Sequence, residues 1–107
     1  MRNFYLINFI ALLVVSCQQN LELPETYDII FINQYFETLD SLIFADNTIN
    51  NIIVGTEVEF YAIPRGQYSI IIFTHSKLKI EATVSLIGTK KVKIFLTENG
   101  ILILENY

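Results

Sequence analysis

The sequence predicts an all-β domain, a small antiparallel β-sandwich of about six to seven strands. Hydrophobic residues make up 52% of the 107 residues, and Ile, Val, Phe, Tyr and Thr are frequent. These residue types suit a pleated, half-buried surface. Apolar and polar residues alternate in several segments between residues 57 and 97, which is the period of a strand with one buried face. Clusters of turn-forming residues separate these segments at regular spacing.

The first half of the domain predicts three short strands. Residues 27–36 are apolar at nearly every position through Ile32, which is typical of a strand covered on both faces. Residues 41–45 form the second candidate. Asn and Asp cluster at 46–48 and 50–51, and because these residues tolerate left-handed backbone, we expect turns there. Only residues 52–54 then remain for a short edge strand.

The second half alternates more regularly. Residues 57–63 read as a strand, and the Pro64-Arg65-Gly66 turn should return the chain into residues 67–74, so we expect these two strands to form a hairpin. Residues 77–86 have apolar residues at every second position. This segment is the most regular amphipathic strand of the chain.

Two more strands close the domain. A turn at residues 88–90 precedes a strand over 91–97 in which Val92, Ile94 and Leu96 point inward. Asn99-Gly100 predicts a tight type I′ hairpin turn, since both residue types accept positive φ. Residues 101–104 form the final strand.

The amino end has a different pattern. Arg2 supplies a positive charge, residues 4–15 are almost wholly apolar, and Val14-Val15-Ser16-Cys17 ends the run. A charged start, a short apolar stretch and a small residue before a cleavage site are typical of an export signal. The apolar run is about a dozen residues, shorter than the roughly 20 that a membrane-spanning helix needs. We therefore expect a signal-peptide helix ahead of the sandwich.

The segment resembles a bacterial lipoprotein signal peptide with its lipobox, because the only cysteine stands where the cut would fall. The resemblance implies a signal peptide over 1–16 and an acylated Cys17 with a tether over 17–26. Residues 27–107 then remain for the predicted β-sandwich. Gln18 and Gln19 show no acidic retention signal, so we expect anchoring in the outer membrane of the cell envelope. Which face of that membrane carries the domain stays open. Two other interpretations are an ordinary secretory signal with an unmodified Cys17 and a buried strand over 4–15.

The segment from Phe60 to Ile70 carries a second resemblance. It reads F-x-x-I-P-x-G-x-Y-x-I, which is similar to a hairpin of transthyretin-like (prealbumin-like) modules, including carboxypeptidase regulatory-like domains. The resemblance covers residues 57–97 and implies that Tyr68 packs beside Phe60 across the hairpin. Such modules serve as stalks, spacers or docking domains, and no catalytic residue comes with them. The Asn-rich turns of the first half depart from the family pattern.

Charge and residue types exclude several functions. The formal net charge is −4, whereas nucleic-acid binding uses clustered Lys and Arg. His75 is the only histidine, so neither a histidine metal site nor a catalytic histidine pair is expected. Glu57 and Glu59 share a strand face that we expect to be solvated. The acids and amides between residues 40 and 50 do not have the spacing of a calcium loop. We expect a non-enzyme without metal or cofactor.

Aromatic residues are the remaining candidates for binding. Those that alternation does not place inside, and that form the candidate interaction surface, are Tyr35, Phe36, Tyr61 and Phe95. We expect a structural or docking subunit of an envelope complex, with a lipid bilayer and an envelope protein as partners. The alternative is a lipoprotein that binds a glycan or another small ligand. A concave pocket with convergent polar groups would favour the ligand, and a flat aromatic strip would favour docking.

Overall fold

The computed structural model describes residues 24–107, so the predicted signal peptide, Cys17 and most of the predicted tether lie outside the described residues. Within this range the chain forms eight strands rather than six to seven, and no helix that could cross a membrane. The strands are β1 (Thr26–Asn33), β2 (Leu39–Phe44), β3 (Asn47–Ile52), β4 (Glu57–Pro64), β5 (Gly66–Thr74), β6 (Lys79–Leu86), β7 (Lys91–Leu96) and β8 (Leu102–Asn106).

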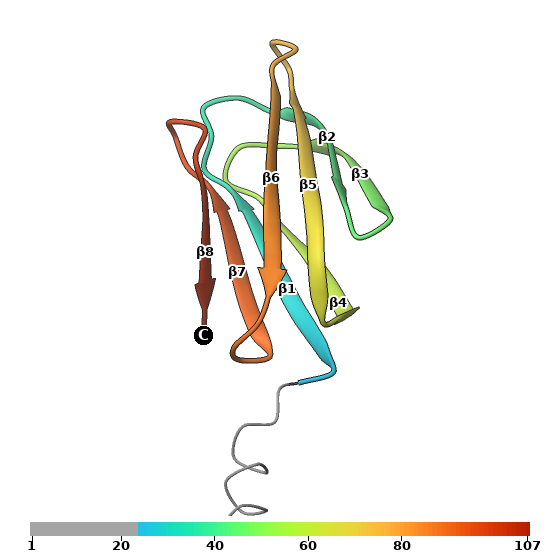
Figure 1. Ribbon diagram of the computed structural model, residues 1–107. Helices are drawn as coiled ribbons and strands as arrows, with labels where there is room; N and C mark the ends of the chain where they lie inside the picture. The colour runs from blue at the N-terminus through green and yellow to red at the C-terminus, as the bar shows by residue number, and fades with distance from the viewer. Residues whose placement is uncertain (1–23) are drawn as a thin grey trace, which may run out of the picture.

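The strands form two four-stranded sheets that pack as a sandwich (Figure 1). Sheet A has the order β4-β1-β7-β8, and sheet B has the order β3-β2-β5-β6. Only the β1–β7 pair is parallel; the other five pairs are antiparallel. The predicted all-β sandwich is confirmed.

The sandwich has two distinct ends. Consecutive strands run in alternate directions, so the connections 34–38, 53–56, 75–78 and 97–101 all lie at one end. We call this the distal end. The chain enters β1 at the opposite end, near the C-terminus (Figure 1), and we call this the entry end.

The core lies between the inward faces of the two sheets. Burial in β1 alternates strictly, with Tyr27, Ile29 and Phe31 fully buried and their neighbours half-buried. The prediction that both faces of this strand are covered was therefore wrong, because within residues 24–107 no layer packs on the outer face of sheet A. Sheet B contributes further buried side chains, including Leu42 and Ile72. Each such side chain stabilises the fold by about 1.5–3 kcal/mol.

The predicted hairpin between residues 57–63 and 67–74 does not form. Strand β4 belongs to sheet A and β5 to sheet B, so the turn between them carries the chain across the sandwich. Phe60 and Tyr68 both pack on Phe44 of β2, with ring centroids 5.4 and 5.6 Å away. The Tyr68 hydroxyl also donates a hydrogen bond of 2.6 Å to the Pro64 carbonyl, which ties the crossing to the start of β5.

The Asn-rich middle also differs from the prediction. Residues 47–52 form β3, and only Ala45 and Asp46 make a turn, with φ of 48° and 66°. Ile53 and Val54, predicted as strand, lie in the connection to β4. Asparagine is tolerated in β3 because this strand is at the edge of sheet B, where its four polar residues are all exposed to water.

The last turn is longer than a type I′ hairpin. Of Asn99 and Gly100, only Gly100 has positive φ, at 79°. Thr97 instead closes the connection, because its hydroxyl accepts a hydrogen bond of 3.1 Å from the Ile101 amide.

Candidate functional site

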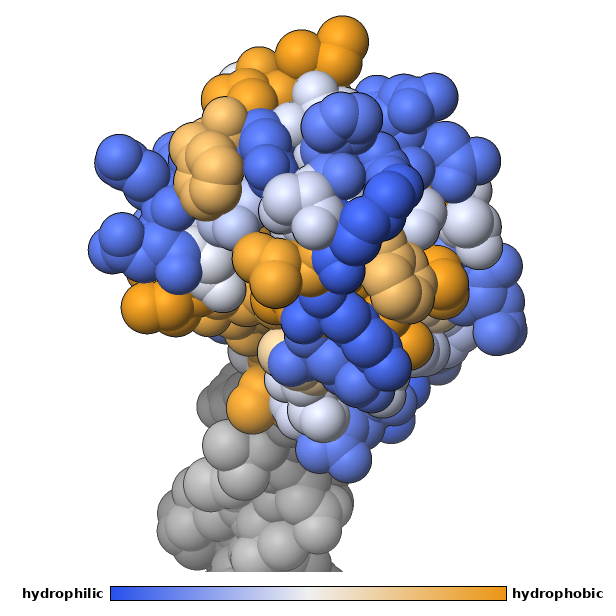
Figure 2. All heavy atoms as spheres, turned by 90° about the horizontal axis from the view of Figure 1, so that it is seen from above, coloured by the Kyte–Doolittle hydropathy of each residue, from blue (hydrophilic) through white to orange (hydrophobic). Residues whose placement is uncertain are grey.

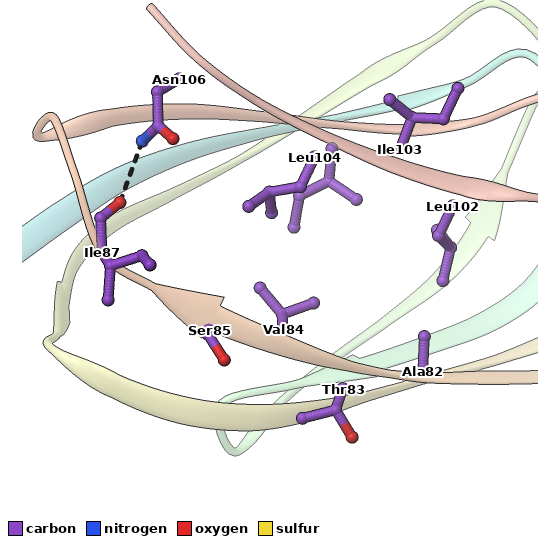
Figure 3. A pocket seen from close by; sticks show the side chains of 10 residues that line it. Ala82, Thr83, Val84, Ser85, Ile87, Leu102, Ile103, Leu104 and Asn106 are labelled. Atoms are coloured by element: carbon purple, nitrogen blue, oxygen red, sulfur yellow. Dashed lines mark hydrogen bonds between the residues drawn. The ribbon is translucent and has the colours of Figure 1, made fainter.

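An apolar groove runs between the edge strands β6 and β8, where the two sheets are not joined. Its volume is about 370 Å³. Figure 3 shows the side chains that line it. We call it the β6–β8 groove. It is lined by Ala82, Thr83, Val84, Ser85, Ile87, Ile94, Leu102, Ile103, Leu104 and Asn106.

The groove exposes part of the hydrophobic core. Ala82 and Val84 of β6 point toward Leu102 and Leu104 of β8 (Figure 3). Ile94, on the neighbouring strand β7, is 2% exposed, whereas Leu104 is 41% exposed. Apolar side chains that face inward but remain accessible are characteristic of a binding surface.

The polar groups around the groove are directed elsewhere. Thr83 and Ser85 point away from its centre (Figure 3), and the Ser85 hydroxyl accepts a hydrogen bond of 3.2 Å from the Gln67 amide. The Asn106 amide donates to the carbonyls of Ile87, at 3.1 Å, and Thr89, at 3.3 Å. Small-molecule sites usually have a few polar groups that converge on the ligand, and the lining residues of this groove have none.

The backbone of β8 offers hydrogen-bonding groups at its open edge. The Tyr107 amide donates to the Lys91 carbonyl, and the Thr97 amide donates to the Ile101 carbonyl. In an antiparallel pair, consecutive residues direct their backbone groups to opposite sides. The odd-numbered residues of β8 therefore face β7. The even-numbered ones, Leu102, Leu104 and Asn106, direct their amides and carbonyls to the open edge.

The distal end is a second place where large apolar side chains are exposed. They are Phe36, Ile53, Val54, Leu78 and Ile101, with exposed fractions from 45 to 66%. Figure 2 looks down on this end and shows hydrophobic side chains at separate places between hydrophilic ones. The distal end therefore has several small apolar spots rather than one continuous patch.

Hydrogen bonds from side chains fix the distal connections. Asn33 is fully buried, and its amide donates to the carbonyls of Ile52, at 3.0 Å, and Glu37, at 3.3 Å. Its side-chain oxygen Oδ1 accepts a hydrogen bond of 3.0 Å from the backbone amide of Tyr35. Thr74 acts similarly, since its hydroxyl accepts from the Leu78 amide at 3.0 Å. The sequence placed Asn33 inside the predicted strand over residues 27–36. Its role in joining two connections depends on tertiary contacts.

A polar cluster joins the 75–78 turn to the start of β2. The Asp40 carboxylate accepts a hydrogen bond of 2.8 Å from the Lys77 ammonium, and its other oxygen lies 3.3 Å from His75 Nδ1. The Lys77 ammonium, followed by His75, lowers the pKa of Asp40. Ser76 donates to Glu37 through its hydroxyl at 2.7 Å and its amide at 3.0 Å. These two bonds lower the pKa of Glu37.

This cluster does not have the arrangement of a nucleophilic site. The Ser76 hydroxyl is bonded to Glu37 rather than to His75, and the His75 side chain is 76% exposed. A serine nucleophile needs a hydrogen bond to its base. Within residues 24–107 there is also no group of three His, Cys, Asp or Glu side chains placed to hold a metal ion.

The four aromatic residues singled out from the sequence lie in three separate places. Tyr35 is 5% exposed and packs beside Phe36, with ring centroids 4.4 Å apart, while Phe36 is 66% exposed at the distal end. Tyr61 is 67% exposed on β4, where its hydroxyl donates to the Glu59 carboxylate. Phe95 is half-buried on the outer face of sheet A. No flat aromatic strip joins them.

Comparison with known proteins gives a match of fold. No protein-family model matches the chain, and no characterised protein matches it. The NMR structure of a protein from Eubacterium rectale is similar, with a TM-score of 0.56 and 23% sequence identity. The match covers 77% of this chain and 88% of that one. At this level of identity the similarity describes the architecture alone.

Proposed function

We propose that the chain is a lipid-anchored, non-catalytic docking subunit of a bacterial envelope complex, and that the β6–β8 groove is its docking site. One observation carries the docking part: the groove is apolar, lies beside an open strand edge and has no polar group directed into it. A protein segment can use backbone hydrogen bonds and apolar contacts together. A glycan needs convergent polar groups, which the lining residues do not provide.

The anchoring part is supported by the pattern of residues 1–17. An acylated Cys17 would leave six residues before Pro24, and such a segment spans at most about 25 Å. The entry end would then lie close to the outer membrane, with the groove along the side of the domain. A single acyl chain binds a membrane weakly, so stable anchoring requires more than one chain.

The two four-stranded sheets of the sandwich support the resemblance to transthyretin-like modules. The hairpin on which the resemblance was based does not form, since the Pro64–Gly66 turn lies between strands of different sheets. We propose a prealbumin-like domain, preceded by a signal-peptide helix in the precursor. The stalk and docking roles of such modules agree with the proposed function.

Affinity capture from detergent-solubilised envelopes tests the proposal. We expect the wild-type protein to recover the same partner protein in each preparation. Leu104→Lys places a charge in the groove and should abolish this recovery, because an unpaired ammonium is costly to bury. Ile53→Lys, at a side chain that is 60% exposed at the distal end, is the matched control and should leave it unchanged. Repeated recovery of the wild-type protein alone would contradict the docking role.

A further inference from the structure

The turn between β6 and β7, residues 87–90, lies at the entry end of the sandwich. The Asp28 amide, near the start of β1, donates a hydrogen bond of 2.9 Å to the Lys90 carbonyl, and Figure 1 shows the turn at the same end as the start of β1. On the other side of β1, the Arg65 amide donates to the Glu25 carbonyl at 2.9 Å. Two turns therefore flank the point where the chain enters the domain.

The 87–90 turn combines the side-chain types of a bilayer interface. Ile87 is 59% exposed, and Lys90 and Lys91 are exposed after it. Tyr107 is 47% exposed beside them, and its amide donates to the Lys91 carbonyl at 3.0 Å. Tyrosine is enriched at membrane–water interfaces, and lysine buries its methylene groups while its ammonium reaches polar groups. An isoleucine, a tyrosine and two lysines thus lie together at this end.

Hydrogen bonds hold this turn in one shape. The Asn106 side-chain amide donates to the carbonyls of Ile87, at 3.1 Å, and Thr89, at 3.3 Å. Gly88 supplies the positive φ of 86° that the reversal requires. Ile87 stands at the end of the β6–β8 groove that is nearest the entry end. Because the turn is already ordered, a contact through Ile87 costs little conformational entropy.

The charges near the turn nearly balance. Lys91 is in register with Asp28, and Lys93 is in register with Glu105. A surface that contacts this turn therefore needs no strong charge of its own. Its apolar part receives the isoleucine, and a polar layer above it receives the lysines, which is the order of layers in a neutral bilayer.

We infer that residues 87–91 and Tyr107 contact the bilayer in which the chain is anchored. This inference rests on the proposed acylation of Cys17, and it names the residues that meet the lipid. Ile87 enters the boundary between head groups and acyl chains. Tyr107 lies among the head groups, and the Lys90 ammonium reaches the lipid phosphates.

The tether makes a weak contact sufficient. Six residues between Cys17 and Pro24 span at most about 25 Å, so an acylated chain keeps the entry end near the lipid surface. A tethered group meets its partner at a high effective concentration. Strand β5 has nine residues and is roughly 30 Å long. The apolar side chains of the distal end are therefore held away from the bilayer while the entry end is in contact.

Tryptophan fluorescence tests the inference, because the chain contains no tryptophan. Ile87→Trp and Ile101→Trp each introduce one reporter, at positions that are both 59% exposed and lie at opposite ends of the sandwich. The acylated proteins are placed in phosphatidylcholine vesicles whose acyl chains are brominated. We expect bromine to quench Ile87→Trp at least roughly threefold more strongly than Ile101→Trp.

Two results would overturn the inference. One is equal quenching of the two variants, or no quenching of Ile87→Trp. The other is a blue shift of the Ile87→Trp emission without quenching by bromine. That result would show the turn buried against protein, for example a second copy of the chain, rather than against lipid.

A charge change tests the part assigned to Lys90. Lys90→Glu, made in the Ile87→Trp protein, should lower the quenching severalfold, because lipid phosphates repel the new carboxylate. Lys79→Glu makes the same change of charge at the other end of β6 and should leave the quenching unchanged. An equal effect of the two substitutions would refute a contact between Lys90 and the head groups.

Mass spectrometry of the amino-terminal peptide separates this inference from anchoring. An acylated Cys17 without quenching of Ile87→Trp would keep the anchor and reject the contact. If Cys17 carries no acyl chain, its thiol is coupled to a maleimide lipid, and the same vesicles decide. Quenching in that case would reject the native anchor and keep the lipid-binding turn.

Discussion

Asn33 shows how a single buried polar side chain can organise one end of the domain. Its amide and carbonyl groups are bonded to three backbone groups, and it is fully buried at the end of β1. The bonds join the 34–38 connection to the end of β3. A buried backbone group that loses its partner costs about 1–3 kcal/mol, so this residue matters more than its place in the sequence suggests.

We predict that Asn33→Ala lowers the free energy of unfolding by about 2–4 kcal/mol, because several buried backbone groups lose their partners. Urea denaturation of both proteins measures the change. Asn50→Ala, at an exposed position of β3, is the matched control and should change stability by less than about 0.5 kcal/mol. An equal effect of both substitutions would show that the Asn33 bonds do not stabilise the fold.

The Asp40 carboxylate predicts how the stability of the folded state depends on pH. Its pKa is lowered by Lys77 and then by His75, so the folded state holds the Asp40 proton less tightly than the unfolded state. The stabilisation is present above the pKa of the unfolded state and is lost as the pH falls through the folded pKa. Lys77→Met should raise the pKa of Asp40, measured by NMR titration of its carboxyl carbon. Lys91→Met, at the opposite end of the sandwich, should not, and an unchanged value in Lys77→Met would refute the ion pair.

At the scale of elements, β4 contains an alanine, Ala62, in a left-handed backbone conformation that alanine does not favour. Ala62 has φ of 55°, next to the register irregularity in the β1–β4 pair, and its amide donates to the Asp28 carboxylate at 3.2 Å. Left-handed backbone is unfavourable for residues with a Cβ atom and free of that cost for glycine.

We therefore expect Ala62→Gly to raise the free energy of unfolding by about 0.5–1 kcal/mol. Ala82→Gly, in the regular strand β6, should lower it by about 1 kcal/mol, since glycine weakens a strand interior. Thermal or urea unfolding of the two variants measures both changes. Destabilisation by Ala62→Gly would mean that the irregularity does not strain the wild-type chain.

The sequence predicted the existence of most strands but not their partners. Alternation located residues 57–63, 67–74 and 77–86 close to the strands observed, because one buried face imposes a period of two. The same pattern says nothing about which sheet a strand joins, and a Pro-x-Gly turn serves a crossing as well as a hairpin. β3 was missed because the turn preference of asparagine was given more weight than the pairing available along β2.

At the scale of the whole molecule, the candidate site could not be predicted. The β6–β8 groove exists because the two sheets end with these strands on the same side, and that depends on strand order. The sequence did identify the candidate residues of the aromatic surface, but the fold separates them. The alternation in residues 77–86 placed Ala82 and Val84 on the inner side correctly, without showing that this side remains open.

The positions of the entry end and of the groove connect the fold to the proposed function. The chain enters at one end, and the groove lies along the side of the sandwich (Figure 1). If the entry end lies at a membrane, as proposed above, the β6–β8 groove lies along the side of the domain, where a partner protein can reach it.

The mass of the amino-terminal peptide, after purification of the protein from envelopes in detergent, tests this account most directly. We predict a peptide that begins at Cys17 and carries the added mass of acyl chains. Cys17→Ser should keep its signal peptide or appear in the aqueous fraction. A wild-type protein recovered without detergent, with Met1 present and an unmodified Cys17 thiol, would contradict the account.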